Sequence, residues 1–248
     1  MLAIRGFIVA ITLILLWQLL VVAFNLPPYI LPSPLLTLKS LISSIELITN
    51  QALITITEAT LGFIVSAILG STGALFLIYF RPAYLWFLPV LLVSQALPTF
   101  AIAPLFLIWL GYGMASKIAT TVLMLFFPIT SSFYDGLKKT SPGFIDLAKT
   151  MNGSKWQTLL HIRIPAALPS LGSGLRLAAT FAPMGAVIGE WVGSSKGLGF
   201  LILNANARMQ IDLMFAALLV LVVLTLLFYF TVDLIIRKII FWEKICKS

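Results

Sequence analysis

The chain contains few of the side chains that build disulfides, metal sites and charged surfaces. Of its 248 residues, one is cysteine, one is histidine and only 10% are charged. The lone Cys246 excludes an intrachain disulfide, and the lone His161, with no Cys/His cluster, excludes the usual ligand spacing of a zinc site. The eight acidic residues are scattered along the chain. We therefore expect no metal site.

Apolar residues dominate instead. Hydrophobic side chains make up 60% of the chain and the mean hydropathy is +1.09, whereas soluble domains are roughly 45–50% apolar. Backbone that faces lipid must be hydrogen-bonded within helices or closed barrels, and these apolar runs do not alternate as barrel strands do. The sequence therefore predicts an all-α membrane protein.

Six apolar runs are long enough to cross a bilayer, which takes about 20 residues. The predicted transmembrane helices cover residues 6–24, 53–80, 84–110, 118–134, 171–192 and 213–236 of a single domain, 1–248. A polar loop, 137–169, separates the fourth from the fifth, and 35–48 is a short amphipathic segment. The first run exceeds the h-region of a signal peptide and has no small-x-small site before the prolines that follow, so we expect a retained helix.

Lysine and arginine orient these helices, because cytoplasmic loops are enriched in both. With a cytoplasmic N-terminus, eleven of the sixteen lie on the cytoplasmic side and Arg176 lies inside the fifth helix. The outer side holds Lys39, Lys117, Lys196 and Arg208. We therefore expect a multi-pass protein of the cell inner membrane with both termini in the cytoplasm. The +8 charge is spread over loops that can meet anionic lipid, so it predicts no nucleic-acid partner.

The polar loop contains the stretch DLAKTMNGSKWQTLLHIRIPAALP at 146–169. Ser141 and Pro142 can start a helix there, and Asn152 and Gly153 tolerate the left-handed backbone that would end it. A second short helix is predicted over about 154–161, stopped by Pro165. The apolar side chains on these two helices are Met151, Trp156, Leu159 and Leu160. The loop is thus predicted to be a compact plug for a groove on another protein.

The loop resembles the EAA loop of binding-protein-dependent ABC importer permeases. Members carry Glu-Ala-Ala, three residues, Gly, nine residues and Ile-x-Leu-Pro. The matching positions here are Asp146, Leu147, Ala148, Asn152, Ile162, Ile164 and Pro165. Asp replaces Glu, and Asn replaces Gly with Gly153 one residue later. LPPYILPSP at 26–34 and GAVIGEWVGSSKGLGFLI at 185–202 extend the resemblance to permeases for nitrate, taurine, alkanesulfonates and thiamine-precursor pyrimidines. NANARMQIDLMFAALLVL at 204–221 is most similar to hydroxymethylpyrimidine permeases.

This resemblance implies the fold and the partners. The fold would be that of a type I ABC importer permease, in which a homodimer or a pair of permeases binds two cytoplasmic ATPase subunits and an external solute-binding protein. The chain itself would be non-catalytic and bind no cofactor, with ATP and Mg on the ATPases. The substrate would be hydroxymethylpyrimidine, or alternatively taurine, an alkanesulfonate or nitrate. The implied coupling residues are Asp146, Leu147, Ala148, Met151, Asn152, Gly153, Trp156, Ile162, Ile164 and Pro165.

The candidate pathway residues are polar or aromatic residues inside the predicted spans. A charged group there is a candidate because burying a charge in hydrocarbon costs several kcal/mol. Gln95, Glu190 and Trp191 are the candidates. Glu190 either lines the pathway or makes a structural hydrogen bond, and Trp191 either stacks on a flat ring or anchors at the interface. Glu58 and Arg176 are further intramembrane charges for which structural roles are favoured.

The outer loop before the sixth span combines glycines with polar side chains. Gly193, Gly197 and Gly199 permit turns. The polar residues Asn204, Asn206 and Arg208 either dock the binding protein or solvate the loop. No arginine cluster lies in the outer halves of the helices, which favours a neutral or ring-shaped ligand over an anion.

Three other classes are possible for an apolar chain of this length. A secondary transporter predicts inverted repeats or paired broken helices, and no such repeat is evident. An intramembrane enzyme needs a nucleophile and base at depth, whereas His161 lies in the polar loop. A channel would leave the polar loop without a role. The ABC importer is therefore the preferred interpretation, with a secondary transporter or channel as the alternative.

Overall fold

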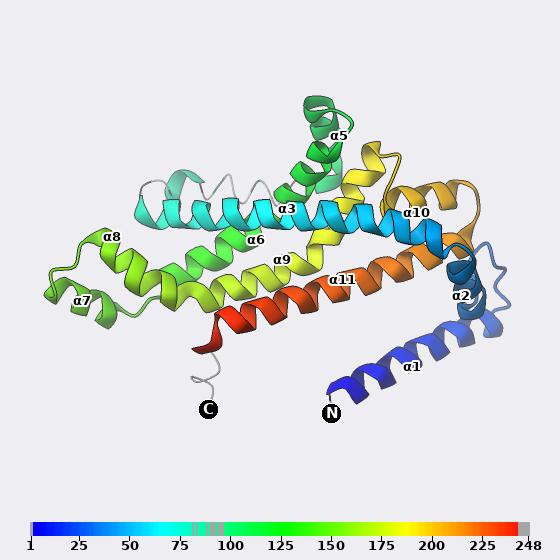
Figure 1. Cartoon of the computed structure of the whole chain (residues 1–248), viewed down its shortest axis with the longest axis horizontal. Helices are drawn as coiled ribbons and strands as arrows, with labels where there is room; N and C mark the ends of the chain where they lie inside the picture. The colour runs from blue at the N-terminus through cyan, green and yellow to red at the C-terminus, as the bar shows by residue number, and fades with distance from the viewer. Residues whose placement is uncertain are drawn as a thin grey trace.

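The computed structural model describes residues 2–80, 82, 84–87, 89, 93 and 97–242, and these residues form helices and no strand. Figure 1 shows long helices running along the length of the molecule, with α7 and α8 at one end and α2 and α10 at the other. The helices are α1 (Leu2–Ala23), α2 (Pro34–Ser43), α3 (Ile45–Tyr79), α5 (Thr99–Leu110), α6 (Met114–Lys138), α7 (Pro142–Thr150), α8 (Lys155–Thr158), η1 (Leu159–Arg163), α9 (Ile164–Gly193), α10 (Leu198–Ala207) and α11 (Ile211–Ile239).

Four helical stretches have the length and apolar composition of a membrane span. These are Ile45–Tyr79, Met114–Lys138, Lys155–Gly193 and Ile211–Ile239. They overlap the predicted spans 53–80, 118–134, 171–192 and 213–236. The predicted span 6–24 corresponds to α1, whose apolar part, Ile11–Ala23, is shorter. The predicted span 84–110 lies partly outside the described residues, and its described end is α5. The all-α membrane fold predicted from the sequence is confirmed.

The prediction that Pro165 stops a short second helix in the polar loop is wrong. α8, η1 and α9 continue without a break from Lys155 to Gly193. The Ile164 N–H bonds to the carbonyl of Leu159, five residues back, which is a π turn. Such a turn widens the helix just before Pro165, whose ring would otherwise crowd the carbonyl four residues back. The widened turn accommodates the proline, so one helical rod of roughly 58 Å results at 1.5 Å per residue.

Helix α6 packs between α3 and α9, and glycines allow the backbones to approach closely. A Cβ on Gly185 of α9 would lie 3.0 Å from the Thr121 Cα, and one on Gly189 would lie 2.9 Å from the Lys117 Cα. Small residues at helix crossings give close van der Waals contact, which drives helix association in lipid. The alanines of α9 continue this contact into a buried cluster formed by Ala59, Leu125, Ile129, Ala178, Ala182 and Ala186.

Ionic contacts join α9 to α11 nearer the α7 end. The Arg176 Nε lies 2.7 Å from Asp233 Oδ1, and the Arg237 Nε lies 2.7 Å from Asp233 Oδ2. Asp233 is buried, and two arginines satisfy both of its oxygens. Breaking such a buried pair is strongly destabilising because it leaves an uncompensated charge. Arg176 therefore has the structural role that its position favours.

The close α6–α9 crossing predicts that a methyl group at Gly189 destabilises the fold. In Gly189→Ala the added methyl group forces the backbone at Lys117 to shift, and overpacking of this kind costs about 1–3 kcal/mol. The melting temperature of the purified protein in detergent should fall by several degrees. Gly73→Ala is the matched control, because its Cβ would meet the Phe126 ring at an ordinary 3.4 Å. Equal melting temperatures for the two variants would contradict the packing argument.

Candidate functional site

The polar loop begins with α7, which ends in a left-handed turn. The Gly153 N–H bonds to the Ala148 carbonyl at 2.8 Å and the Asn152 N–H to the Lys149 carbonyl at 2.9 Å. Asn152 has a φ of 60°, so asparagine takes the left-handed position where the EAA pattern has glycine. A Cβ on Gly153 would lie 2.9 Å from the Ala148 carbonyl oxygen. The turn therefore forms as predicted despite the asparagine.

Helix α8 begins with a capping box that the sequence reasoning missed. The Gln157 N–H bonds to Ser154 Oγ at 3.2 Å, and the Ser154 N–H bonds to Gln157 Oε1 at 2.9 Å. Ser-Lys-Trp-Gln carries the Ser-x-x-Gln spacing that signals this cap. The cap fixes the direction in which α8 leaves the turn.

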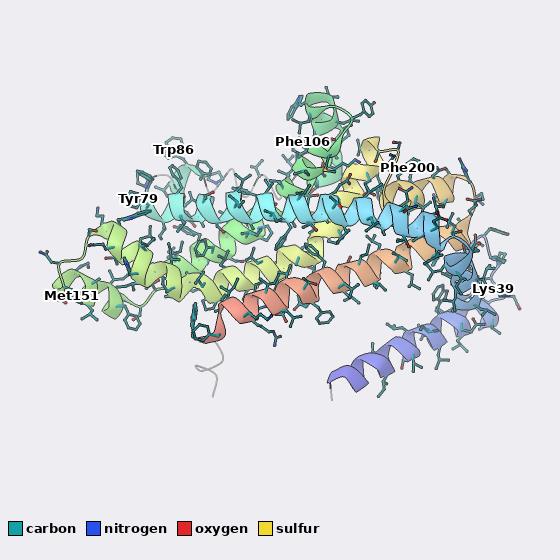
Figure 2. All side chains as sticks on the ribbon, viewed as in Figure 1. Lys39, Tyr79, Trp86, Phe106, Met151 and Phe200 are labelled. Atoms are coloured by element: carbon teal, nitrogen blue, oxygen red, sulfur yellow. The ribbon has the colours of Figure 1, made fainter. Side chains whose placement is uncertain are left out.

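The two helices of the loop leave large apolar side chains exposed at one end of the molecule. Met151 is 76% exposed and Trp156 is 58% exposed, and Figure 2 shows Met151 at the α7 end of the molecule. We call this group the loop surface, formed by Phe144, Leu147, Met151, Trp156 and Leu160. Three of these side chains lie on or just after α7 and two in the first turns of the long helix, and exposed apolar groups of this kind mark a surface for another protein or for the membrane.

The other predicted loop residues support this surface in different ways. Ala148 is buried under the turn. Asp146 is exposed and pairs with Lys149 at 2.9 Å. Ile164 packs against the cluster of Ala74, Phe133, Leu137, Leu159 and Ala167, Ile162 is half-buried, and Pro165 is exposed.

At the opposite end, the predicted outer loop is largely a buried short helix, α10. Its first backbone N–H groups bond to side chains of α3 and α9. The Gly197 N–H bonds to Gln51 Oε1 at 2.6 Å, and the Leu198 N–H bonds to Thr55 Oγ1 at 2.8 Å. The Gly199 N–H bonds to Glu190 Oε2 at 2.5 Å. These N–H groups have no partner within their own helix, so the side chains serve as its cap.

Glu190 is the centre of this cap. It is 1% exposed and also accepts a hydrogen bond of 2.6 Å from Thr55 Oγ1. Gly197 has a φ of 105°, and a Cβ there would overlap the Glu190 carboxylate. The structural hydrogen bond that the sequence left open for Glu190 is therefore present, and a pathway role remains a prediction.

A buried ion pair lies beside this cap, and the sequence analysis did not predict it. The Lys117 Nζ lies 2.7 Å from Glu58 Oε1, and both side chains are buried. The predicted span boundaries put Lys117 on the outer side. Its pairing with Glu58 was missed because 59 residues separate the two partners and no local pattern links them. The glycine at 189 brings α9 against Lys117, which encloses the pair. The ion pair ties α3 to α6 at the same level as the α10 cap.

The remaining candidate residues for the pathway and for docking differ in their exposure, and one of them lies outside the described residues. Trp191 is 40% exposed and meets the Phe100 ring edge-on, with ring centres 6.3 Å apart. Asn204 is half-buried, whereas Asn206 and Arg208 are exposed at the end of α10. Gln95 lies outside the described residues. Within the described part of the chain, no group of three or more His, Cys, Asp or Glu side chains could hold a metal ion.

Long apolar helices with an exposed apolar surface at one end define a multi-pass membrane protein built to contact a partner. The chain belongs to the family of binding-protein-dependent transport system inner membrane components, whose sequence pattern matches residues 62–241. It is therefore a non-catalytic permease subunit of an ABC importer in the inner membrane. Importers of this class work with an ATPase and a binding protein.

Three relatives match most of the chain. A probable ABC transporter permease protein of Haemophilus influenzae is 48% identical over 92% of this chain and 93% of its own length. The formylaminopyrimidine transport permease ThiX of Halalkalibacterium halodurans is 34% identical, covering 88% and 87%. The riboflavin transport system permease RibX of Chloroflexus aurantiacus is 34% identical, covering 93% and 87%.

A solved structure supports the fold. The crystal structure of an amino acid ABC transporter with histidines matches with a TM-score of 0.64 over 80% of this chain and 97% of that one. The identity is 14%, so this likeness concerns the fold alone. The type I importer permease architecture that the resemblance implied is confirmed.

The cap on α10 predicts a local effect of removing one hydroxyl. Thr55→Val keeps the side-chain shape but removes the bonds to Glu190 and to the Leu198 N–H. A buried group left without its partner costs about 1–3 kcal/mol, so amide hydrogen exchange over 198–207 should be about tenfold faster in nanodiscs. Thr72→Val is the control, because its hydroxyl is exposed and bonds only within α3. Unchanged exchange in Thr55→Val would show that α10 is held by other contacts.

Proposed function

We propose that this chain forms a homodimeric or paired permease that passes a thiamine-precursor pyrimidine, such as hydroxymethylpyrimidine, from a binding protein to the cytoplasm. Two ATPase subunits, which carry ATP and Mg, bind the two polar loops. The permease itself binds no cofactor. The loop end and both termini face the cytoplasm, in keeping with the lysine and arginine distribution.

The main support for a coupling role is the exposed loop surface. Its apolar side chains lie on α7 and on the first turns of the long helix that begins at Lys155, which are joined by the left-handed turn at Asn152 and the Ser154 capping box. A preorganised apolar knob loses little conformational freedom on docking, which favours tight binding. The coupling residues are those given for the EAA resemblance, with Phe144 and Leu160 added from the loop surface.

The continuous helix from Lys155 to Gly193 gives this docking a mechanical consequence. Its first turns belong to the loop surface, and its last turn carries Glu190, the cap of α10. Movement of α8 by the ATPases is therefore transmitted along α9 to the opposite end. Closure of the ATPases draws the two loops together and tilts the helix bundles as rigid bodies, which opens the outer end.

The charges at the α10 end support a neutral, ring-shaped substrate. A sulfonate or nitrate would be favoured by a buried cation that is free to pair with it. The buried cation there, Lys117, is already paired with Glu58, whereas Lys196 and Arg208 are exposed. The accessible Trp191 ring, packed on Phe100, offers a face on which a flat heterocycle can stack. ThiX, which resembles this chain, is named for a pyrimidine.

The alternative substrates are riboflavin, taurine, an alkanesulfonate and nitrate. Riboflavin shares the flat nitrogen ring and is the substrate in the name of RibX. Taurine, alkanesulfonates and nitrate are substrates of the permease subfamily that the chain resembles. Asn204, Asn206 and Arg208, at the exposed end of α10, are the proposed docking residues for the binding protein.

The left-handed turn predicts opposite effects for two substitutions at one position. Asn152→Gly keeps the turn and should leave ATPase activity coupled to the loaded binding protein. Asn152→Val places a β-branched residue at a φ of 60°, which costs about 1–3 kcal/mol and displaces Met151. Binding of the ATPase, measured by co-purification, should fall more in Asn152→Val than in Gly189→Ala, which has a similar cost in stability but keeps the turn. Normal coupling in both variants would count against the docking role of the turn.

The substrate proposal is tested with an ATPase and a binding protein from the genome that encodes this chain. The complex in nanodiscs is supplied with binding protein loaded with hydroxymethylpyrimidine, riboflavin, taurine or nitrate, and ATP hydrolysis is measured. Hydroxymethylpyrimidine should give the strongest stimulation. Stimulation by taurine or nitrate alone would replace the pyrimidine with a sulfonate or with nitrate, and failure of any ATPase to bind would contradict the coupling role.

A further inference from the structure

A cavity of about 660 Å³ lies at the loop end, separate from the loop surface. Its walls come from the end of α3, from α7 and from α8 with η1. The apolar part includes Ile78, Ile145 and Leu159, and the basic part includes Lys149, Lys155 and Arg163. The lining therefore offers contacts for both hydrocarbon and an anion.

The charge of the cavity is positive. Asp146 also lines it, but this carboxylate is paired with Lys149 at 2.9 Å. Lys155 and Arg163 form no ion pair with any acidic side chain in the described part of the chain. Two cations are thus left for a ligand, and an arginine beside a lysine suits a phosphate group.

Aromatic side chains at and near the cavity are of the kinds found at the level of lipid headgroups. Tyr79, which lines the cavity, ends the long apolar helix α3 and meets Trp156 edge-on at 6.0 Å. Tyr84 stacks on Tyr134 with ring centres 4.6 Å apart, and the Lys138 Nζ lies 5.9 Å from the Tyr84 ring centre. Tyr, Trp and Lys gather where membrane spans meet the interface. Figure 2 shows Tyr79 near the end of the bundle that carries the loop.

Helix α7 uses different faces for the cavity and for the loop surface. Pro142, Ile145 and Lys149 line the cavity at a spacing of three and four residues. Phe144, Leu147 and Met151 have the same spacing and are exposed. Residues three and four apart share one face of a helix. A partner that covers the loop surface therefore contacts a different face of α7 from the one that lines the cavity.

We propose that this cavity binds the phosphate headgroup of an anionic phospholipid, with the phosphate between Lys155 and Arg163 and an acyl chain against Ile78. Basic pockets between helices at the membrane surface bind anionic headgroups in this way. A lipid bound there contacts α3, α7 and α8 at once. It therefore stabilises the loop relative to the bundle.

The test uses the purified full-length permease in nanodiscs of phosphatidylcholine with increasing phosphatidylglycerol. Native mass spectrometry counts the retained phosphatidylglycerol, and a melting curve measures its effect. The double variant Lys155→Gln/Arg163→Gln should bind phosphatidylglycerol at least about tenfold more weakly. The control Lys39→Gln/Arg208→Gln removes two exposed cations elsewhere and should bind like the parent. Lys155→Arg/Arg163→Lys keeps both charges and should also retain the lipid.

Two further arms separate the sources of the anion. Glycerol phosphate or inorganic phosphate, added to phosphatidylcholine nanodiscs, should not raise the melting temperature. Stabilisation by either would mean that the ligand is a free phosphate, and it would contradict the proposal of a bound lipid. Displacement of phosphatidylglycerol by the ATPase would mean that a protein segment fills the cavity. Equal phosphatidylglycerol binding by the Lys155/Arg163 and Lys39/Arg208 variants would also overturn the proposal.

Discussion

The structure depends on the close contact of α6 with α3 and α9. Lipid provides no hydrophobic force to hold apolar helices together, so their association rests on shape and on a few buried polar bonds. Gly185 and Gly189 bring the α9 backbone against Thr121 and Lys117. Lys117 then reaches Glu58, and Glu190 meets the first turn of α10. The glycines thus set both the helix spacing and the position of the polar groups.

The same contact makes α9 a rigid connection between the two ends of the molecule. A π turn carries the helix through Pro165, so the polar loop and the α10 cap belong to one rod (Figure 1). An importer permease has to convert movement at its ATPase into a change at the distant face. A continuous rod with an exposed knob at one end and a capped short helix at the other provides this without bond chemistry in the chain.

The sequence was sufficient for the features that local patterns control. Apolar runs predicted the long helices, and Asn152–Gly153 predicted the end of α7. The prediction that Pro165 ends a helix was wrong because a π turn before the proline makes room for its ring. The sequence pattern does not reveal that turn. The outer segment was read as a loop because its polar residues obscured the apolar positions that α10 buries. The pairs Glu58–Lys117 and Arg176–Asp233 join residues 59 and 57 positions apart, so only the fold brings them together.

The central claim is that movement of the polar loop and of the α10 end is coupled through α9. In the homodimer proposed above, spin labels at Ser141→Cys, an exposed residue outside the loop surface, or at Lys196→Cys, each with Cys246→Ser, report the distance between the two copies. Trapping the ATPases with nucleotide should shorten the Ser141 distance and lengthen the Lys196 distance together. A change at Ser141 with no change at Lys196 would contradict the account.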